Sequence, residues 1–150
     1  MTSIPVYLDS GAVMPDRAYH DDAGLDLYSR EPAIVPAYDS FVFDTGVHIH
    51  IPSGYAGLIV SKSGLNINHG LTSDGLVDAS YTGSIRVKLY NHTPFAQKIE
   101  AGQKISQLVI IPFLPVDLEQ TFTPLTQTER GSNGFGSSGR FKHDTNEASD

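Results

Sequence analysis

Residues 84–91 carry the pattern that most limits the fold, because the sequence SIRVKLYN alternates strictly between polar and apolar side chains. Ile85, Val87 and Leu89 fall on one face of an extended chain, and polar or charged residues fall on the other. A hydrophobic period of two indicates a β-strand with one buried face. Residues 46–52 (GVHIHIP) repeat the pattern. The chain is therefore expected to contain half-buried strands.

Other short segments complete a pattern of many strands joined by frequent turns. Residues 55–62 and 104–113 are more continuously apolar, as in strands that are buried more fully. Turn signals fall between these segments, at residues 52–54, 74–75, 82–83 and 101–102. We find no helical stripe of useful length and no internal repeat. These features predict an all-β sandwich or barrel.

Length and charge limit the partners that the chain can bind. Its 150 residues suit one domain, and the absence of cysteine fits a reducing compartment. A net charge of −7 disfavours stable nucleic-acid binding, because phosphate neutralisation needs a basic surface. Eight of the ten lysines and arginines lie from Lys62 onward. A small anionic ligand could therefore still meet a few local cations.

The sequence also predicts that the protein has no membrane partner. The first ten residues, MTSIPVYLDS, lack the basic region and apolar run of a signal peptide. The longest apolar run, LVIIPFLPV at residues 108–116, is short and contains two prolines. We expect a soluble protein in the cytoplasm of a bacterium, or in the host cytoplasm if the gene is phage-encoded.

The strand pattern ends near residue 126, where a polar segment rich in glycine and serine begins. We predict one β domain over residues 1–125 and a mobile C-terminal arm over residues 126–150. The arm contains the sequence RGSNGFGSSGR at residues 130–140. Its composition is that of a flexible linker, yet it places an arginine and a phenylalanine at defined positions.

Residues 75–83 (GLVDASYTG) place a carboxylate and an aromatic ring between two turn signals. The dipeptide Asp74-Gly75 predicts a tight hairpin, and a second turn is expected at residues 81–83. Asp78 could hold a water or a sugar hydroxyl, while Tyr81 packs on a sugar or a base. Composition alone favours the alternative, in which Asp78 is an exposed turn residue and Tyr81 belongs to the core.

Three further polar sites lie in or beside apolar strands. The hydroxyl, ammonium and backbone N–H groups of residues 61–64 (SKSG) suit a phosphate chain, although a simple polar strand end is the favoured alternative. Gln107 lies within an apolar strand, so its amide needs a backbone or ligand partner. Asp26 is either a site carboxylate or a strand-end charge paired with an arginine, and the pairing is favoured.

His48 and His50 share one face of a predicted strand and invite comparison with a metal site. No third ligand with suitable spacing is apparent. We therefore favour a solvated strand face over a metal site.

Together and in this order, five segments resemble the motifs of the homotrimeric dUTP pyrophosphatases (dUTPases). They read AGLDLYS (23–29), SKSG (61–64), GLVDASYTGSI (75–85), GQKISQLV (102–109) and RGSNGFGSSG (130–139). The third and fifth are highly specific, and the match covers nearly the whole chain. The resemblance implies an antiparallel jelly-roll-like β fold and a homotrimer with shared active sites. It also implies hydrolysis of dUTP to dUMP and pyrophosphate, which keeps uracil out of DNA and supplies dUMP for dTMP synthesis.

The resemblance assigns the base and the sugar to the third motif. Asp78 would bind the deoxyribose 3′-hydroxyl and orient the attacking water as a general base. Tyr81 would pack beneath the deoxyribose and leave no room for a 2′-hydroxyl. The backbone of Leu76, Val77 and Asp78 would read the uracil edge, with a contribution from the backbone near Arg86.

The resemblance assigns the phosphates to the second and fourth motifs and to the arm. The phosphate ligands in the β domain would be Lys62, Ser63, Gly64 and Gln107. In the arm, Phe135 would stack on uracil, Arg130 would meet the terminal phosphate, and Gly136 and Ser137 would reach the phosphate chain. Mg²⁺ would sit on the three phosphates without a direct protein ligand. Asp26 would support the site from behind as an internal ion pair.

Three positions depart from the usual motifs of this family. Lys62 stands in place of arginine, so its phosphate contact lacks bidentate geometry. Ser84 stands where an acid or an amide is common. Gln103 replaces a carboxylate that elsewhere supports subunit contacts.

Two alternative functions share the predicted fold. A dCTP deaminase would need a further acid–base carboxylate at the pyrimidine, and residues 75–83 offer only Asp78. A catalytically silent regulatory protein is the second alternative. The presence of Asp78, Tyr81 and Phe135 argues against it.

Overall fold

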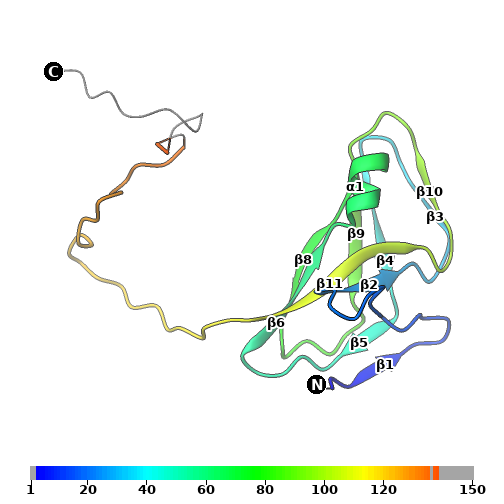
Figure 1. Ribbon diagram of the computed structural model, residues 1–150, viewed down its shortest axis with the longest axis horizontal. Helices are drawn as coiled ribbons and strands as arrows, with labels where there is room; N and C mark the ends of the chain where they lie inside the picture. Colours follow the sequence, from blue (N-terminus) through cyan, green and yellow to red (C-terminus); the bar gives the residue numbers. More distant parts are fainter. Residues whose placement is uncertain (1–2, 136, 139–150) are drawn as a thin grey trace. The chain divides into compact units, whose positions relative to one another are not determined.

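The computed structural model describes residues 3–135 and 137–138, and the chain divides into two units, Met1–Pro115 and Val116–Asp150. All regular elements of the described residues lie in the first unit (Figure 1). In chain order they are β1 (Val6–Leu8), β2 (Gly24–Tyr28), β3 (Ala33–Val35), β4 (Ser40–Asp44), β5 (Val47–Ile49), β6 (Tyr55–Val60), α1 (Ser63–His69), β7 (Leu71–Thr72), β8 (Asp74–Val77), β9 (Arg86–Asn91), β10 (Gln97–Ile99) and β11 (Lys104–Pro112).

Every pair of these strands is antiparallel, and the strands form two larger sheets and two short ribbons. The larger sheets have the strand orders β2-β11-β6-β8 and β4-β9-β7, and the ribbons are β1-β5 and β3-β10. The long strand β11 lies between β2 and β6 (Figure 1). The predicted antiparallel all-β fold is confirmed. Its form is a sandwich, because the described strands do not close into a barrel.

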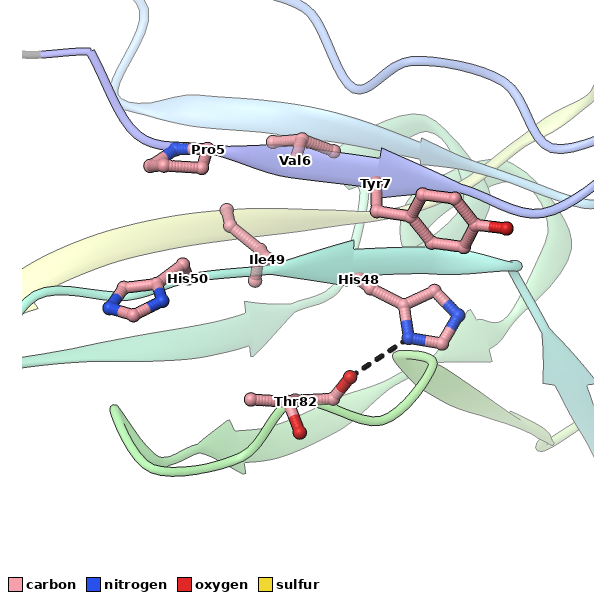
Figure 2. A pocket seen from close by; sticks show the side chains of 7 residues that line it. All are labelled: Pro5, Val6, Tyr7, His48, Ile49, His50 and Thr82. Atoms are coloured by element: carbon pink, nitrogen blue, oxygen red, sulfur yellow. Dashed lines mark hydrogen bonds between the residues drawn. The ribbon is translucent and has the colours of Figure 1, made fainter.

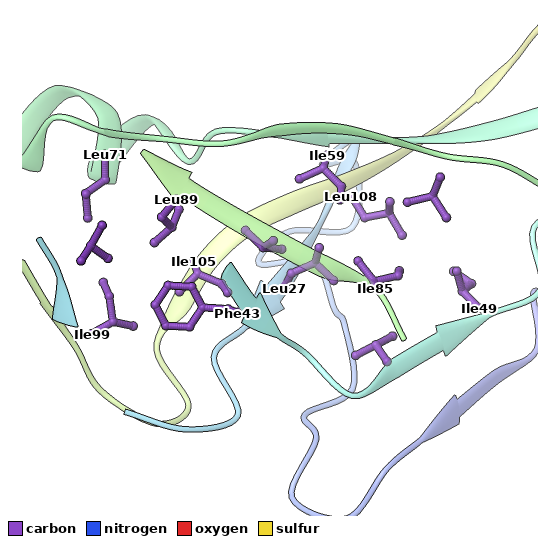
Figure 3. Packing of buried hydrophobic residues seen from close by; sticks show 14 of the residues in the cluster. Leu27, Phe43, Ile49, Ile59, Leu71, Ile85, Leu89, Ile99, Ile105 and Leu108 are labelled. Carbon is purple, nitrogen blue, oxygen red and sulfur yellow. The ribbon is translucent and has the colours of Figure 1, made fainter. Parts of the chain in front are cut away.

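The core lies between the two larger sheets (Figure 3). Strand β9 contributes Val87 and Leu89, which are 0% and 1% exposed. The residues that alternate with them, Arg86, Lys88 and Tyr90, are exposed. Leu27 and Leu108 face them from the four-stranded sheet and are also fully buried. Full burial of one such side chain contributes about 1.5–3 kcal/mol. The alternation of residues 84–91 therefore corresponds to the core face of a strand, as predicted.

The short helix α1 was missed in the sequence analysis. Its seven residues include no buried side chain, so the helix leaves no hydrophobic period in the sequence. It ends at Gly70, whose φ of 61° lies in the left-handed region that favours glycine. The Gly70 N–H donates to the Asn66 carbonyl at 3.0 Å and closes the last turn.

The tight hairpin predicted at Asp74-Gly75 is wrong, because both residues lie within β8 and pair with β6. The chain changes sheets one residue earlier, at Ser73 between β7 and β8. The Ser73 N–H donates to the Ser61 hydroxyl at 2.9 Å, and its own hydroxyl lies 2.7 Å from that of Ser106. These buried bonds satisfy the polar groups of the corner, so no glycine turn is required there.

The described residues of the second unit form turns and bends but no helix or strand. The predicted division into a β domain of residues 1–125 and a mobile arm of residues 126–150 stays a prediction. In the described part of the chain, no helix has both the length and the apolar character needed to cross a membrane.

Candidate active site

A cleft of about 300 Å³ opens along β8 and the start of β9. Its apolar wall includes the buried residues Ile59, Val77 and Ile85, whereas its charged residues are exposed. Apolar walls with a few polar groups are typical of small-molecule sites. The residues that line the cleft are Val42, Ile59, Asp74, Gly75, Leu76, Val77, Asp78, Tyr81, Ile85, Arg86 and Lys88.

Strand β8 presents backbone to this cleft. It is the last strand of its sheet and pairs with β6 along one edge, so within the described residues its second edge has no partner strand. Such an edge offers N–H and C=O groups in a row. Leu76 is 62% exposed, whereas Val77 turns into the core. The strand can therefore read the edge of a flat ligand through its backbone, in the manner of an added strand.

Asp78 and Tyr81 lie together in the cleft, as the sequence predicts. Asp78 directly follows β8, and its carbonyl accepts the Tyr81 N–H at 3.0 Å in a turn. The Tyr81 hydroxyl donates to the Ser84 carbonyl at 2.9 Å. Its ring lies against Gly83, where a Cβ atom would come within 2.6 Å of the ring. Gly83 therefore allows the tyrosine ring to fold back over the loop.

A second group of site residues surrounds the buried carboxylate of Asp26, which is 4% exposed. Lys62 Nζ lies 2.5 Å from one carboxylate oxygen, and Lys104 Nζ lies 2.7 Å from the other. The predicted ion pair is present, but its partners are two lysines and the prediction of an arginine is wrong. These three groups together carry one net positive charge, and Asp16 and Asp22 also act on Lys104 electrostatically.

The charges of this cluster shift the pKa values of Asp26 and Lys104. Burial alone would raise the pKa of Asp26, but hydrogen bonds from Lys104 and Lys62 outweigh it and hold that pKa below its usual value. The hydrogen bond to Asp26 raises the pKa of Lys104. Asp26 and Lys104 are therefore both charged at neutral pH.

Gln107, Ser63 and Gly64 lie next to the Asp26 cluster. Gln107 lies on β11 in register with Asp26 of β2. Its amide side chain crosses above Gly24, where a Cβ atom would come within 2.2 Å of Gln107 Oε1. Ser63 and Gly64 begin helix α1 directly after Lys62 and are exposed. The predicted phosphate ligands of the second and fourth motifs are thus brought together.

Asp78 and the Asp26 cluster lie at opposite ends of the ladder between β6 and β8, along which the cleft runs. Lys62 follows the end at which Val60 is paired, and Asp78 follows the end at which Val77 is paired. Roughly six residues of extended chain separate Lys62 from Asp78 along this ladder, which corresponds to about 20 Å. A single chain therefore does not place Asp78 beside the lysines.

Sequence analysis did not identify Lys104 as a site residue. It pairs with Asp26 and lies 6.0 Å from the centroid of the Tyr28 ring. The Tyr28 hydroxyl donates to Asp16 at 2.7 Å, and burial together with this bond raises the pKa of Tyr28 to about 12. A signal for Lys104 was available, since it belongs to the fourth motif, GQKISQLV.

The fifth motif belongs to the second unit. Arg130 is exposed, and its Nε donates to the Asn133 carbonyl at 3.0 Å. Phe135 is fully exposed and has a positive φ of 26°. The Ser137 N–H donates to the Gly134 carbonyl at 2.9 Å, and Gly136 lies outside the described residues. Within this unit, the guanidinium and the ring are both accessible to a ligand.

His48 and His50 differ in their surroundings. His50 is exposed, as the expected solvated face requires, but His48 is not solvated in this way. His48 Nδ1 lies 2.9 Å from the Thr82 carbonyl oxygen, and Nε2 lies 3.3 Å from Asp9 Oδ1. Within residues 3–135 and 137–138, no group of three or more histidine or acidic side chains is placed to hold a metal ion.

The fold and the cleft define a class of protein. An antiparallel β-sandwich presents an edge strand, a carboxylate and an aromatic ring in one cleft, and a cationic cluster lies on the same sheet. These are the groups needed to bind a base, a sugar and phosphates. Together they describe a nucleotide-binding β-sandwich.

The comparisons with known proteins identify the family. The dUTPase family model matches residues 11–139. The deoxyuridine 5′-triphosphate nucleotidohydrolase of Tropheryma whipplei (strain Twist) is 42% identical over 144 residues, which cover 92% of this chain and 95% of that protein. The enzyme of the same name from Clostridium acetobutylicum is 36% identical over 138 residues, 90% of this chain and 94% of that protein. This chain belongs to the dUTPase family.

Solved structures agree with the family assignment. The dUTPase of Staphylococcus bacteriophage 80alpha with dUpNHpp has a TM-score of 0.86 and 30% identity, over 93% of this chain and 100% of that chain. A mutant dUTPase from phage phi11 of S. aureus, described with a structural Mg(II) ion, has a TM-score of 0.76 and 27% identity, over 81% of this chain and 98% of that chain.

Proposed function

We propose that this protein hydrolyses dUTP to dUMP and pyrophosphate. The observation that carries the proposal is the cleft in which Asp78, Tyr81 and the free edge of β8 lie together, in a chain of the dUTPase family. The reaction serves a nucleotide pool, so we place the protein in the cytoplasm.

The cleft binds the base and the sugar. Uracil pairs with the backbone of Leu76, Val77 and Asp78 at the exposed edge of β8, with a contribution from the backbone near Arg86, which also lines the cleft. Tyr81 packs against the deoxyribose. Its hydroxyl is tied to the Ser84 carbonyl and its ring lies on Gly83, so the ring has little freedom to make room for a 2′-hydroxyl.

Asp78 acts as the general base. Its carboxylate is exposed in the cleft, where it can hold the 3′-hydroxyl and a water molecule. The carboxylate accepts a proton as the water oxygen forms a bond to the α-phosphorus. The bond from that phosphorus to the bridging oxygen breaks, and pyrophosphate leaves with both electrons of the bond.

The Asp26 cluster binds the phosphate chain, together with Ser63, Gly64 and Gln107. Because the Asp26 carboxylate already accepts from Lys62 and Lys104, the cluster offers cations to phosphate oxygens and no free carboxylate to a metal. We therefore place Mg²⁺ on the three phosphates of the substrate, where it would neutralise developing negative charge.

The complete site is shared between the chains of a homotrimer. On one chain Asp78 and Lys62 lie at opposite ends of a ladder, so a nucleotide that touches both is bound by two chains. A third chain provides the fifth motif. Its Phe135 stacks on uracil, Arg130 meets the terminal phosphate, and Gly136 and Ser137 reach the phosphate chain.

A pyrophosphate-release assay tests the proposal directly. With Mg²⁺ present, dUTP should yield dUMP and pyrophosphate, whereas UTP should react poorly. Incubation with dCTP should release no ammonia. This control addresses the deaminase alternative, because Asp74 is a further carboxylate in the cleft. Failure to release pyrophosphate from dUTP would favour the regulatory alternative.

A further inference from the structure

His48 lies in a second cavity, which opens beside the ribbon of β1 and β5 (Figure 2). The cavity has a volume of about 310 Å³ and is lined by Pro5, Val6, Tyr7, His48, Ile49, His50 and Thr82. The imidazole of His48 points toward Thr82, whereas His50 lies at the other end of the cavity (Figure 2). Thr82 directly follows Tyr81, so this cavity and the nucleotide cleft meet at one loop.

Both ring nitrogens of His48 face oxygen atoms that can only accept hydrogen bonds. Nδ1 lies 2.9 Å from the Thr82 carbonyl oxygen, and Nε2 lies 3.3 Å from Asp9 Oδ1. Nε2 is shielded from solvent and makes no hydrogen bond among the described residues, so its contact with Asp9 is one of charge. A neutral imidazole has only one N–H group, so one of its nitrogens would place a lone pair against an acceptor oxygen. The doubly protonated imidazolium donates to Thr82 and places positive charge against Asp9.

The surrounding charges favour the imidazolium. Asp9 and Asp44 are the acidic groups near the ring, and Tyr7 packs against it with a centroid separation of 5.4 Å. Arg30 is the opposing cation, but it is engaged with both acids, at 3.5 Å from Asp9 and 3.9 Å from Asp44. The bond to Thr82, followed by the contact with Asp9, raises the pKa of His48 above its usual value.

The loop that His48 contacts has few other anchors. Among the described residues, the bond to the Thr82 carbonyl is the hydrogen bond that ties residues 79–83 to a strand outside their own loop. Beyond it, Ser84 is fixed by the Gly46 N–H at 2.9 Å and by Asp44. Tyr81 is held at its hydroxyl by Ser84, and the bond from His48 to Thr82 is a further anchor for the ring in the cleft.

We propose that His48 is a positioning residue, which as an imidazolium paired with Asp9 holds the Tyr81–Thr82 loop through the Thr82 carbonyl and so sets the discrimination between deoxyribose and ribose. The inference rests on the proposed sugar-binding role of Tyr81. Protonated His48 fixes the ring of Tyr81 against the sugar. Loss of the proton removes the positive charge that strengthens the bond to the Thr82 carbonyl, so the loop loosens and a 2′-hydroxyl is tolerated better.

The test is the ratio of kcat/KM for dUTP to kcat/KM for UTP, measured from pH 6 to pH 9. The ratio cancels ionisations that both substrates share, including those of Asp78 and the phosphates. The pKa of His48 is raised, so the discrimination is fully present at the lower pH and is lost as the pH rises through that pKa. We expect the wild-type ratio to fall about five- to tenfold, the difference between a hydrogen bond from a charged donor and one from a neutral donor.

Three variants distinguish a positioning role of His48 from a general loss of structure. His48→Ala should show the low ratio at every pH. His48→Asn keeps a neutral donor near the Nδ1 position, so it should show an intermediate ratio that does not change with pH. His50→Ala, in the same cavity, should keep the wild-type profile. A wild-type ratio that does not change with pH, or a His48→Ala ratio equal to the wild-type ratio, would overturn the inference.

A titration by NMR tests the contact without substrate. The amide signals of Thr82 and Gly83 should shift with the same midpoint as the imidazole of His48, and this midpoint should disappear in His48→Asn. Amide signals that do not follow the imidazole would overturn the inference. If they do follow it while wild-type enzyme hydrolyses UTP and dUTP equally, the sugar-binding role of Tyr81 is wrong and the role of His48 in discrimination falls with it.

Discussion

Asp26 is the residue that holds the two lysines proposed to bind phosphate. Its carboxylate is almost fully buried and separates two ammonium groups that would otherwise repel each other. Removal of one partner from a buried ion pair is costly because the remaining charges stay uncompensated. The lysines are partly exposed, so water reduces that cost here.

Asp26→Asn should lower the free energy of unfolding by about 1–3 kcal/mol, as measured by urea denaturation at pH 7. Asp21→Asn, at an exposed position, should leave it unchanged. The pKa of Asp26 is lowered in the folded protein, so its contribution is present above the unfolded-state pKa of about 3.9 and is lost as the pH falls through the folded-state pKa. The difference between wild type and variant should therefore shrink in acid. A difference that is constant down to pH 2 would contradict this account.

Asp78→Asn should reduce turnover of dUTP by about 10²- to 10⁴-fold, the usual contribution of a positioned base. Asparagine keeps the shape of the side chain but cannot accept the proton. The exposed carboxylate is not part of the core, so the midpoint of thermal unfolding should not change. Near wild-type turnover would move the base to another residue.

The sequence reveals the residues of the cleft more readily than their partners. Asp78 and Tyr81 are predictable because both belong to one short, specific motif, and a local turn brings them together. The partners of Asp26 are not, because β2, β6 and β11 are distant in the sequence and meet only in the folded sheet. The contacts of His48 were not predictable for the same reason, since they come from two other segments.

At the level of elements, the spacing of hydrophobic residues decides which strands and helices can be predicted from the sequence. Strand β9 has one face in the core, so its sequence alternates and its position is predictable. Helix α1 has no buried residue and leaves no such trace. The dipeptide Asp74-Gly75 has the composition of a turn but lies in a strand, because serine hydrogen bonds at Ser73 form the corner instead.

The fifth motif should act as a lid held closed by the ligand. Its glycines make closure entropically costly, so contacts with nucleotide must compensate. Phe135→Ala removes a stack worth about 1–3 kcal/mol, so kcat/KM should fall about 5- to 150-fold. Binding of dUMP and of a non-hydrolysable dUTP analogue should weaken alike.

Arg130→Ala should act differently, because dUMP lacks the outer phosphates. It should harm turnover of dUTP and spare binding of dUMP. Limited proteolysis provides the measurement for the wild-type arm, with dUMP and with the analogue. If neither ligand protects residues 126–150 from cleavage, this segment is a linker and not a lid.

At the scale of the whole molecule, we propose that no single chain holds a complete active site. The ladder between β6 and β8 separates Asp78 from Lys62 by about 20 Å, estimated from the rise of an extended chain. We propose that a ring of identical chains solves this problem by bringing one end of the ladder to the opposite end on a neighbour. In this proposal, the arm that carries Phe135 and Arg130 closes on a neighbouring chain.

Subunit complementation tests this claim most directly. Chains with Asp78→Asn are mixed with chains truncated before Arg130, and subunit exchange is verified by mass. Each parent should be nearly inactive. With random mixing of equal amounts, three quarters of the trimers contain both chains, and each mixed trimer has one site with both Asp78 and an arm. Recovery of about one quarter of wild-type activity is expected for a closed ring of three. No recovery after verified exchange would show that Asp78 and the arm come from the same chain, and would contradict the shared site.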